Sequence, residues 1–143
     1  AMYAKKFMRT GDIHPIARHG EEPEEMIYKT FDEMIAMIHQ MIQNEYKTTA
    51  IICKTEKDLN RLISSLTVPF HILDGQTEKF EAGLLVTTIQ YAKGLEFDAV
   101  LVPFVDEFNY HTSYDQGLLY IATTRAMHQL TMFIDANNKS PLL

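Results

Sequence analysis

The residues best suited to chemistry lie between Val86 and Val100, in the segment VTTIQYAKGLEFDAV. Hydroxyl, amide, ammonium and carboxylate groups stand here between two apolar stretches that are typical of buried strands. Loops at the carboxyl ends of parallel strands often hold ligands, so we expect these polar groups to crowd the gap between the two strands. An ordinary polar connection would have a similar composition, and the spacing alone does not separate the two interpretations.

Arg125 is a second candidate, in the segment LLYIATTRAMHQL. Its guanidinium is planar and permanently charged, and its N–H donors form a fork that suits phosphate oxygens. An arginine in the C-terminal half of a helix also serves simply as a partner of the helix dipole. The residue type leaves both roles open.

Together the two segments resemble motifs V and VI of the superfamily 1A helicases, the UvrD, Rep and PcrA type. TTIQYAKGLEFDAV resembles the motif V pattern T-x-H-x-x-K-G-L-E-F-x-x-V, and LLYIATTRA resembles the motif VI pattern L-x-Y-V-A-x-T-R-A. The likeness is greatest to the HelD-type helicases, whose second motor domain carries KGLEFDAV and TRA-x-H-x-L segments. It extends over residues 48–134 and is loose over the N-terminal third.

The resemblance implies a role for each matched residue. Arg125 would be the arginine finger that reaches the γ-phosphate of ATP. Glu96 would contact the ATP ribose, with Gly94 allowing a close backbone approach and Lys93 beside it. Thr88 would hold the backbone of single-stranded DNA.

Five further residues concern nucleic acid. Gln90 stands where the family has histidine, and its amide can donate to a phosphate but cannot become charged. Lys54 and Thr55 occupy a strand–helix turn that touches single-stranded DNA in relatives, although a plain helix N-cap also accounts for Thr55. Tyr91 and Tyr120 have faces on which bases could stack, although Tyr120 matches the motif VI tyrosine and packing in the core also accounts for it.

The pattern of apolar residues predicts strands that alternate with helices, and therefore an α/β fold with a mainly parallel sheet. The resemblance sharpens this to a RecA-like, P-loop-NTPase-like fold, the second motor domain of a helicase pair. We expect residues 1–20 to be irregular, 21–136 to form the domain and 137–143 to be a tail, in a segment cut from a longer protein. The expected strands are 48–54, 70–73, a run ending near Val86, 98–103 and 130–134. The expected helices are 21–42, one capped by Thr55, and one from Ser113 to about Met127 that begins with a capping box of Ser113 and Gln116. Residues 76–83 are expected to be loop.

Composition limits the partners. The 143 residues suit one domain, and the net charge of −6 predicts a weak grip on nucleic acid without help from other domains. No apolar run has the length of a membrane span, so we expect no membrane partner. The single cysteine, Cys53, fits a reducing cytoplasm, and no spacing of Cys and His suits a metal.

The chain also lacks G-x-x-x-x-G-K-[ST] and an acidic pair of the Walker B kind. ATP and its Mg²⁺ would therefore need an N-terminal RecA-like domain of the same protein. The resemblance implies the C-terminal motor domain of an ATP-dependent DNA helicase or translocase, acting on single-stranded or duplex DNA. Two alternatives stay open: a HelD-like motor that remodels RNA polymerase without unwinding DNA, and a non-catalytic interaction module, against which the intact TTRA and KGLEF segments argue.

Overall fold

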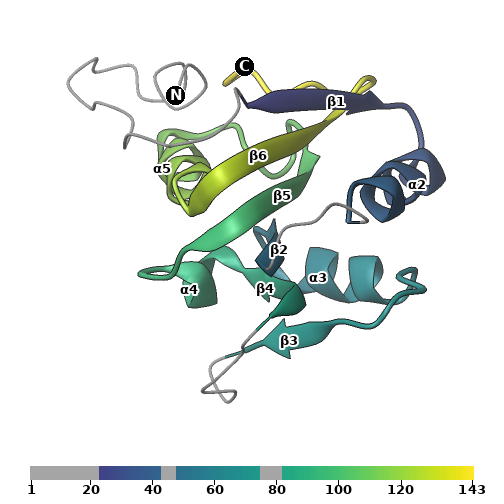
Figure 1. Ribbon diagram of the computed structural model, residues 1–143. Helices are drawn as coiled ribbons and strands as arrows, with labels where there is room; N and C mark the ends of the chain where they lie inside the picture. Colours follow the sequence, from purple (N-terminus) through teal and green to yellow (C-terminus); the bar gives the residue numbers. More distant parts are fainter. Residues whose placement is uncertain (1–22, 43–47, 75–81) are drawn as a thin grey trace.

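A parallel sheet forms the middle layer of the protein (Figure 1). The structure is a computed structural model, and it describes residues 23–42, 48–74 and 82–143. Within them the sheet has six strands in the order β1-β6-β5-β2-β4-β3, and every pair of neighbours is parallel. The strands are β1 (Glu24–Tyr28), β2 (Thr48–Cys53), β3 (His71–Leu73), β4 (Gly83–Thr88), β5 (Phe97–Val105) and β6 (Ala126–Asp135), and the helices are α2 (Phe31–Met41), α3 (Glu56–Ile63), α4 (Ile89–Ala92) and α5 (Ser113–Thr123). The predicted α/β fold with a mainly parallel sheet is confirmed.

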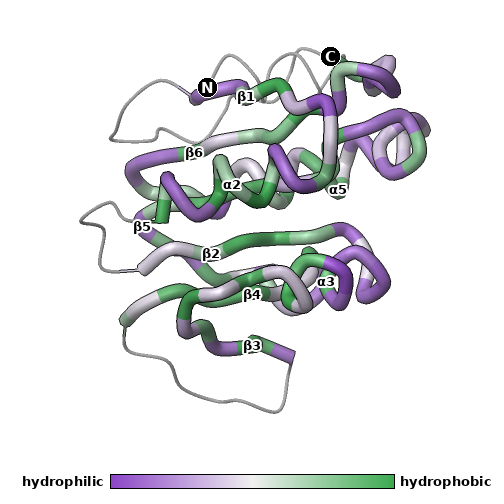
Figure 2. Tube along the Cα trace, turned by 90° about the vertical axis from the view of Figure 1, so that its right-hand side faces the viewer, coloured by the Kyte–Doolittle hydropathy of each residue, from purple (hydrophilic) through white to green (hydrophobic). Residues whose placement is uncertain are grey.

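Each face of the sheet has its own hydrophobic core, because successive side chains of a strand point to opposite faces. On one face, α4, α5 and the C-terminal residues pack on Ala50 and Ile52 of β2. On the other face, α2 and α3 pack on Ile51 and Cys53 of the same strand. The tube in Figure 2 is correspondingly hydrophobic along β2 and β4 and mixed along α2. The near-continuous apolar strands follow from burial on both sides.

The chain changes direction in the centre of the sheet. The connection after β2 runs through α3 toward β3 and β4, whereas the connection after β5 runs through α5 to β6 on the other side. β2 and β5 are neighbours, so their carboxyl ends mark the switch point at which open α/β sheets commonly bind ligands. The loop at Lys54 and the loop of residues 106–112 meet there.

The prediction of a helix from residue 21 was wrong, because Glu24–Tyr28 is a strand. It pairs with β6, and the helix begins only after Thr30, whose hydroxyl accepts a hydrogen bond from the Glu33 N–H. The 3–4 spacing of Ile27 and Phe31 continued the helical pattern across the boundary by coincidence. Backbone hydrogen bonds to β6 outweigh the modest helix preference of EEMI, since propensity is a weak prior against tertiary pairing.

Two boundaries near the C-terminus also differ from the prediction. Thr112 is the N-cap of α5, and it forms the capping box with Asp115, where Ser113 and Gln116 were expected. The helix ends at Thr123, and β6 begins at Ala126, where continued helix had been predicted. A carboxylate accepts the N-cap backbone N–H better than an amide does, which selects Asp115.

Residues 137–143, expected as a tail, lie against the domain. Ser140 is buried, and its hydroxyl donates to the carbonyl of Tyr110. Leu142 and Leu143 pack against the hydrophobic core to which α5 also contributes. The predictions for residues 1–20 and 76–81 lie outside the described residues.

Ile52→Ala should lower the free energy of unfolding by about 2–5 kcal/mol, because the Ile52 side chain is fully buried in the centre of the sheet. Ile27→Ala is the matched control: Ile27 is 54% exposed on the edge strand, so the loss should be under about 1 kcal/mol. Urea unfolding followed by circular dichroism measures both. Equal losses would contradict this assignment of the core.

Candidate functional site

The two ends of the VTTIQYAKGLEFDAV segment lie at opposite ends of the parallel strands. We call the side where the strands end the carboxyl edge of the sheet, and the side where they begin the amino edge. Thr88 pairs with Cys53 at the carboxyl edge, whereas Asp98, close after Glu96, is bonded to Thr48 at the amino edge. β2 lies between β4 and β5, and α4 with the following turn carries the chain back, about 16 Å along the strand direction. The expectation that these polar groups crowd one gap at the carboxyl ends was therefore wrong. Parallel strands require such a return.

Arg125 lies at the amino edge, between the end of α5 and the turn before β5. Its Nε donates to the Ile121 carbonyl at 3.2 Å, one terminal nitrogen donates to the Leu95 carbonyl at 3.4 Å, and the other donates to the Thr124 hydroxyl at 3.2 Å. A guanidinium has five N–H donors, so these bonds leave one on each terminal nitrogen. The side chain is partly buried, and its three hydrogen bonds hold its orientation. Two N–H groups of the guanidinium remain available to a ligand.

The turn that Arg125 contacts carries the other candidate nucleotide residues. Gly94 has a φ of +81°, a left-handed conformation that favours glycine. Lys93, Gly94 and Glu96 are exposed, and the Phe97 N–H donates to the Arg125 carbonyl at 2.9 Å. The four residues that the resemblance assigned to ATP thus share one edge of the sheet. Their chemistry fits a nucleotide, with an arginine fork for phosphate and an exposed carboxylate for ribose hydroxyls.

Sequence reasoning missed a polar cluster beside this turn. The Asp98 carboxylate accepts hydrogen bonds from the Thr48 N–H at 3.0 Å and the Thr48 hydroxyl at 3.1 Å, and the His128 Nε2 lies 3.8 Å from its other oxygen. The β5–β6 register shifts between Phe97 and Ala99, and this irregularity brings His128 beside Asp98. The sequence carried no signal for it, because the two residues meet only through strand pairing.

At the carboxyl edge, Lys54 is already paired. Its ammonium lies 2.7 Å from Asp115, whose carboxylate also accepts the backbone N–H groups of His111 and Thr112 at 3.1 Å each. Burial alone would raise the pKa of Asp115, but the Lys54 hydrogen bond and the two N–H groups outweigh it and hold the pKa at about 2. The Thr112-x-x-Asp115 capping pattern was the sequence signal for Asp115, although not for its ion pair.

The remaining nucleic-acid candidates lie near the same edge. Thr55 caps α3 through a hydrogen bond from the Asp58 N–H at 3.1 Å, as the plain N-cap interpretation required. Thr88 is buried and makes no side-chain cap bond to α4. Gln90 is exposed, and Tyr91 is half-buried on the same short helix.

In the part of the chain that the structure describes, no group of three or more His, Cys, Asp and Glu side chains could hold a metal ion. Cys53 is buried, which raises the pKa of its thiol well above the ordinary range and makes it inert. No helix among the described residues is long and apolar enough to cross a membrane.

Comparison with known proteins places this chain in a family. Residues 83–133, from the start of β4 into β6, match the model of the UvrD-like helicase C-terminal domain. The solved C-terminal domain of a possible DNA helicase from Lactobacillus plantarum is similar over 98% of this chain and 85% of its own length, with 30% identity and a TM-score of 0.78. The chain belongs to the UvrD-like helicase C-terminal domains.

A second solved structure shares the fold. The Arterivirus nonstructural protein 10 helicase, solved in complex with DNA, matches 82% of this UvrD-like domain, which spans 30% of that protein. The identity is 10% and the TM-score is 0.53, so the likeness concerns architecture alone. No curated protein matches the chain in sequence.

Asp115→Asn should lower the free energy of unfolding at neutral pH. An unfolded aspartate has a pKa of about 3.9, and the folded pKa of Asp115 is about 2. Because the folded value is lower, the carboxylate stabilises the fold above about pH 4, and this contribution is lost as the pH falls toward 2. Urea unfolding at several pH values should show that the difference in free energy of unfolding between variant and wild type becomes smaller as the pH falls through that range. A difference that is the same at every pH would contradict the assignment.

Proposed function

We propose that this UvrD-like domain is the C-terminal motor domain of an ATP-dependent DNA helicase or translocase and supplies half of an interdomain ATP site. The observation that carries the proposal is the hydrogen bond from Arg125 to the Leu95 carbonyl, which joins the motif VI arginine to the KGLEF turn of motif V. A first RecA-like domain of the same protein would hold the phosphates and Mg²⁺, since the chain has no phosphate loop.

The amino edge would act on ATP through four of its own residues. The free N–H groups of Arg125 would stabilise charge that develops on the transferred phosphoryl group, as arginine fingers do. Glu96 would accept hydrogen bonds from the ribose hydroxyls. Gly94 would let the backbone of the turn approach the nucleotide, with Lys93 at its rim. ATP would supply the energy for closing and reopening the cleft between the two motor domains.

The return from Thr88 to Glu96 would couple the two edges. A shift of the KGLEF turn toward a nucleotide would be transmitted through α4, whose Ile89 and Ala92 are buried in the core, to Thr88 and Gln90 at the carboxyl edge. The single strand would be held there with the help of Lys54 and Thr55. Packed cores transmit such displacements because they deform little.

The Lys54–Asp115 ion pair limits how strongly this track grips DNA. A phosphate would have to compete with Asp115 for the Lys54 ammonium, because the two groups are 2.7 Å apart. Together with the net charge of −6, this supports weak binding by the domain alone. The same observation favours a second candidate function, in which a HelD-like motor uses the ATP cycle to remodel RNA polymerase.

Arg125→Ala in the protein that carries both motor domains should reduce ATP turnover by about 10² or more, because a transition-state charge loses its partner. ATP affinity should change by less than roughly tenfold, since most ground-state contacts lie elsewhere. Arg125→Lys should rescue turnover poorly, because a point charge cannot reproduce the planar fork. Steady-state ATPase kinetics and nucleotide titration measure the two effects.

Glu96→Ala is the control that separates the roles, since loss of a ribose contact should mainly weaken nucleotide binding. Both variants should stay folded, although Arg125→Ala should unfold more easily because it loses three hydrogen bonds at the end of α5. Normal turnover by a folded Arg125→Ala variant would show that the arginine serves only to hold the end of α5 to the turn.

The domain alone should bind a fluorescein-labelled dT oligomer weakly, with a dissociation constant on the order of 10⁻⁴ M or weaker at physiological salt. Fluorescence anisotropy at several salt concentrations should show the binding disappear as salt rises. Lys54→Gln should weaken it further, and Asp115→Asn should strengthen it by releasing Lys54. Tight binding that resists salt and is unchanged in Lys54→Gln would contradict the proposal that the single strand binds at the carboxyl edge.

A further inference from the structure

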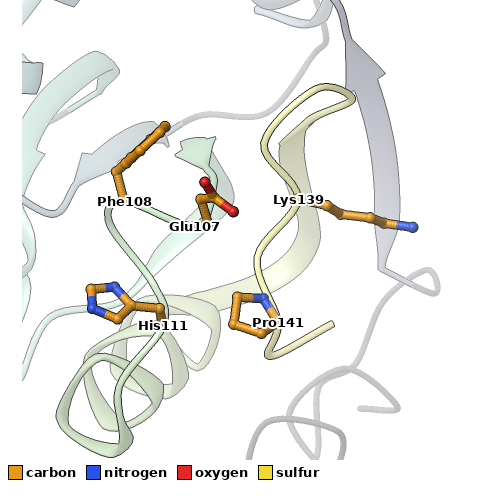
Figure 3. Close-up of a pocket in the computed structure, with 5 residues that line it drawn as sticks. All are labelled: Glu107, Phe108, His111, Lys139 and Pro141. Carbon is orange, nitrogen blue, oxygen red and sulfur yellow. The ribbon is translucent and has the colours of Figure 1, made fainter.

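An open hollow of about 480 Å³ lies beside the carboxyl edge of the sheet, away from the proposed nucleotide residues. Its walls are the loop between β5 and α5 and the C-terminal residues after β6 (Figure 3). The lining residues are Glu107, Phe108, His111, Lys139 and Pro141. The proposed helicase function uses none of these side chains.

Hydrogen bonds hold the loop that carries Phe108. The Asp106 carboxylate accepts the N–H groups of Phe108 at 3.0 Å and Asn109 at 2.9 Å, and the Asn109 amide donates to the Phe104 carbonyl at 3.1 Å. The Glu107 N–H donates to the Asn138 carbonyl at 2.9 Å, which ties the loop to the opposite wall. The Phe108 ring is nevertheless 67% exposed. A large aromatic side chain is thus held in water by a well-bonded backbone, and aromatic anchors are enriched at protein interfaces.

Glu107 is the acidic residue among those that line the hollow. No ion pair or hydrogen bond engages its carboxylate in the described part of the chain. Lys139 extends away from the other four side chains in Figure 3, and the His111 ring is 3.5 Å from Asp115. An exposed ring, a proline and an uncompensated carboxylate therefore face one opening.

We propose that this hollow is a docking surface for a basic segment of a protein partner, with an arginine side chain as its occupant. The guanidinium would pair with the Glu107 carboxylate while its plane packs on the Phe108 ring. Arginine fits better than lysine, because it combines a fork that matches a carboxylate with a face that stacks on aromatic rings. Nucleic acid fits worse, because a phosphate would meet the Glu107 carboxylate and find Lys139 directed elsewhere.

The test is a titration of the isotope-labelled chain, followed by its backbone amide resonances. The probe is N-acetyl-arginine amide, and N-acetyl-citrulline amide, which has a similar shape and no charge, is the control. The arginine probe should cause saturable shifts centred on Glu107, Phe108 and His111, and the citrulline probe should cause clearly smaller ones. Glu107→Gln and Phe108→Ala should each weaken the binding by about two- to fivefold, the range of one exposed charge or ring contact.

Glu25→Gln is the matched control, because it removes an exposed carboxylate from the edge strand and should leave the arginine shifts unchanged. Equal shifts with both probes, or arginine shifts spread over the surface without these residues, would overturn the proposal. A dT oligomer that shifts the same residues and is weakened by Phe108→Ala would overturn it too, since the surface would then be part of the nucleic-acid track.

Discussion

The structure depends on one topological constraint: β4 and β5 are parallel, and β2 lies between them. Each parallel strand starts at the same edge, so the chain must return from the end of β4 before it can begin β5. It does so in eight residues, through α4 and the turn at Gly94. This return separates the residues of motif V into a group near Thr88 at one edge and a group near Glu96 at the other. A single short segment of the sequence therefore supplies residues to both edges.

The pairing of β5 with β6 decides how the amino edge is assembled. The bond from the Phe97 N–H to the Arg125 carbonyl fixes the end of α5 beside the KGLEF turn, and the Arg125 side chain then closes on Leu95. The arginine is ordered by neutral carbonyl and hydroxyl groups. No carboxylate in the described part of the chain pairs with it, so its charge is not cancelled by a fixed partner. In the proposed function, this would leave the Arg125 charge available to a phosphate held by another domain.

The carboxyl edge is organised in the opposite way. The cation expected to meet a phosphate, Lys54, is neutralised by Asp115, and the same carboxylate caps α5 through the N–H of Thr112. One side chain therefore holds the helix start, the loop at His111 and the turn after β2 together. If Lys54 bound a phosphate in the proposed function, it would have to leave Asp115. The Asp115 carboxylate would then keep only its backbone partners, so this edge would be less stable.

The sequence by itself determined the fold class, the buried strands, the Thr55 cap and the two motifs, because these depend on patterns that extend over a few neighbouring residues. The resemblance of two short segments to helicase motifs also singled out Arg125, Glu96 and Gly94, which the fold then brought to one edge. Tertiary structure alone decided that Glu24–Tyr28 is a strand, since its backbone partners on β6 are about a hundred residues away in the chain. It also decided that Thr88 and Glu96 face opposite edges and that Lys54 is paired with Asp115. Strand order and ion pairs are set by groups distant in sequence, and no local pattern records which distant group will be the partner.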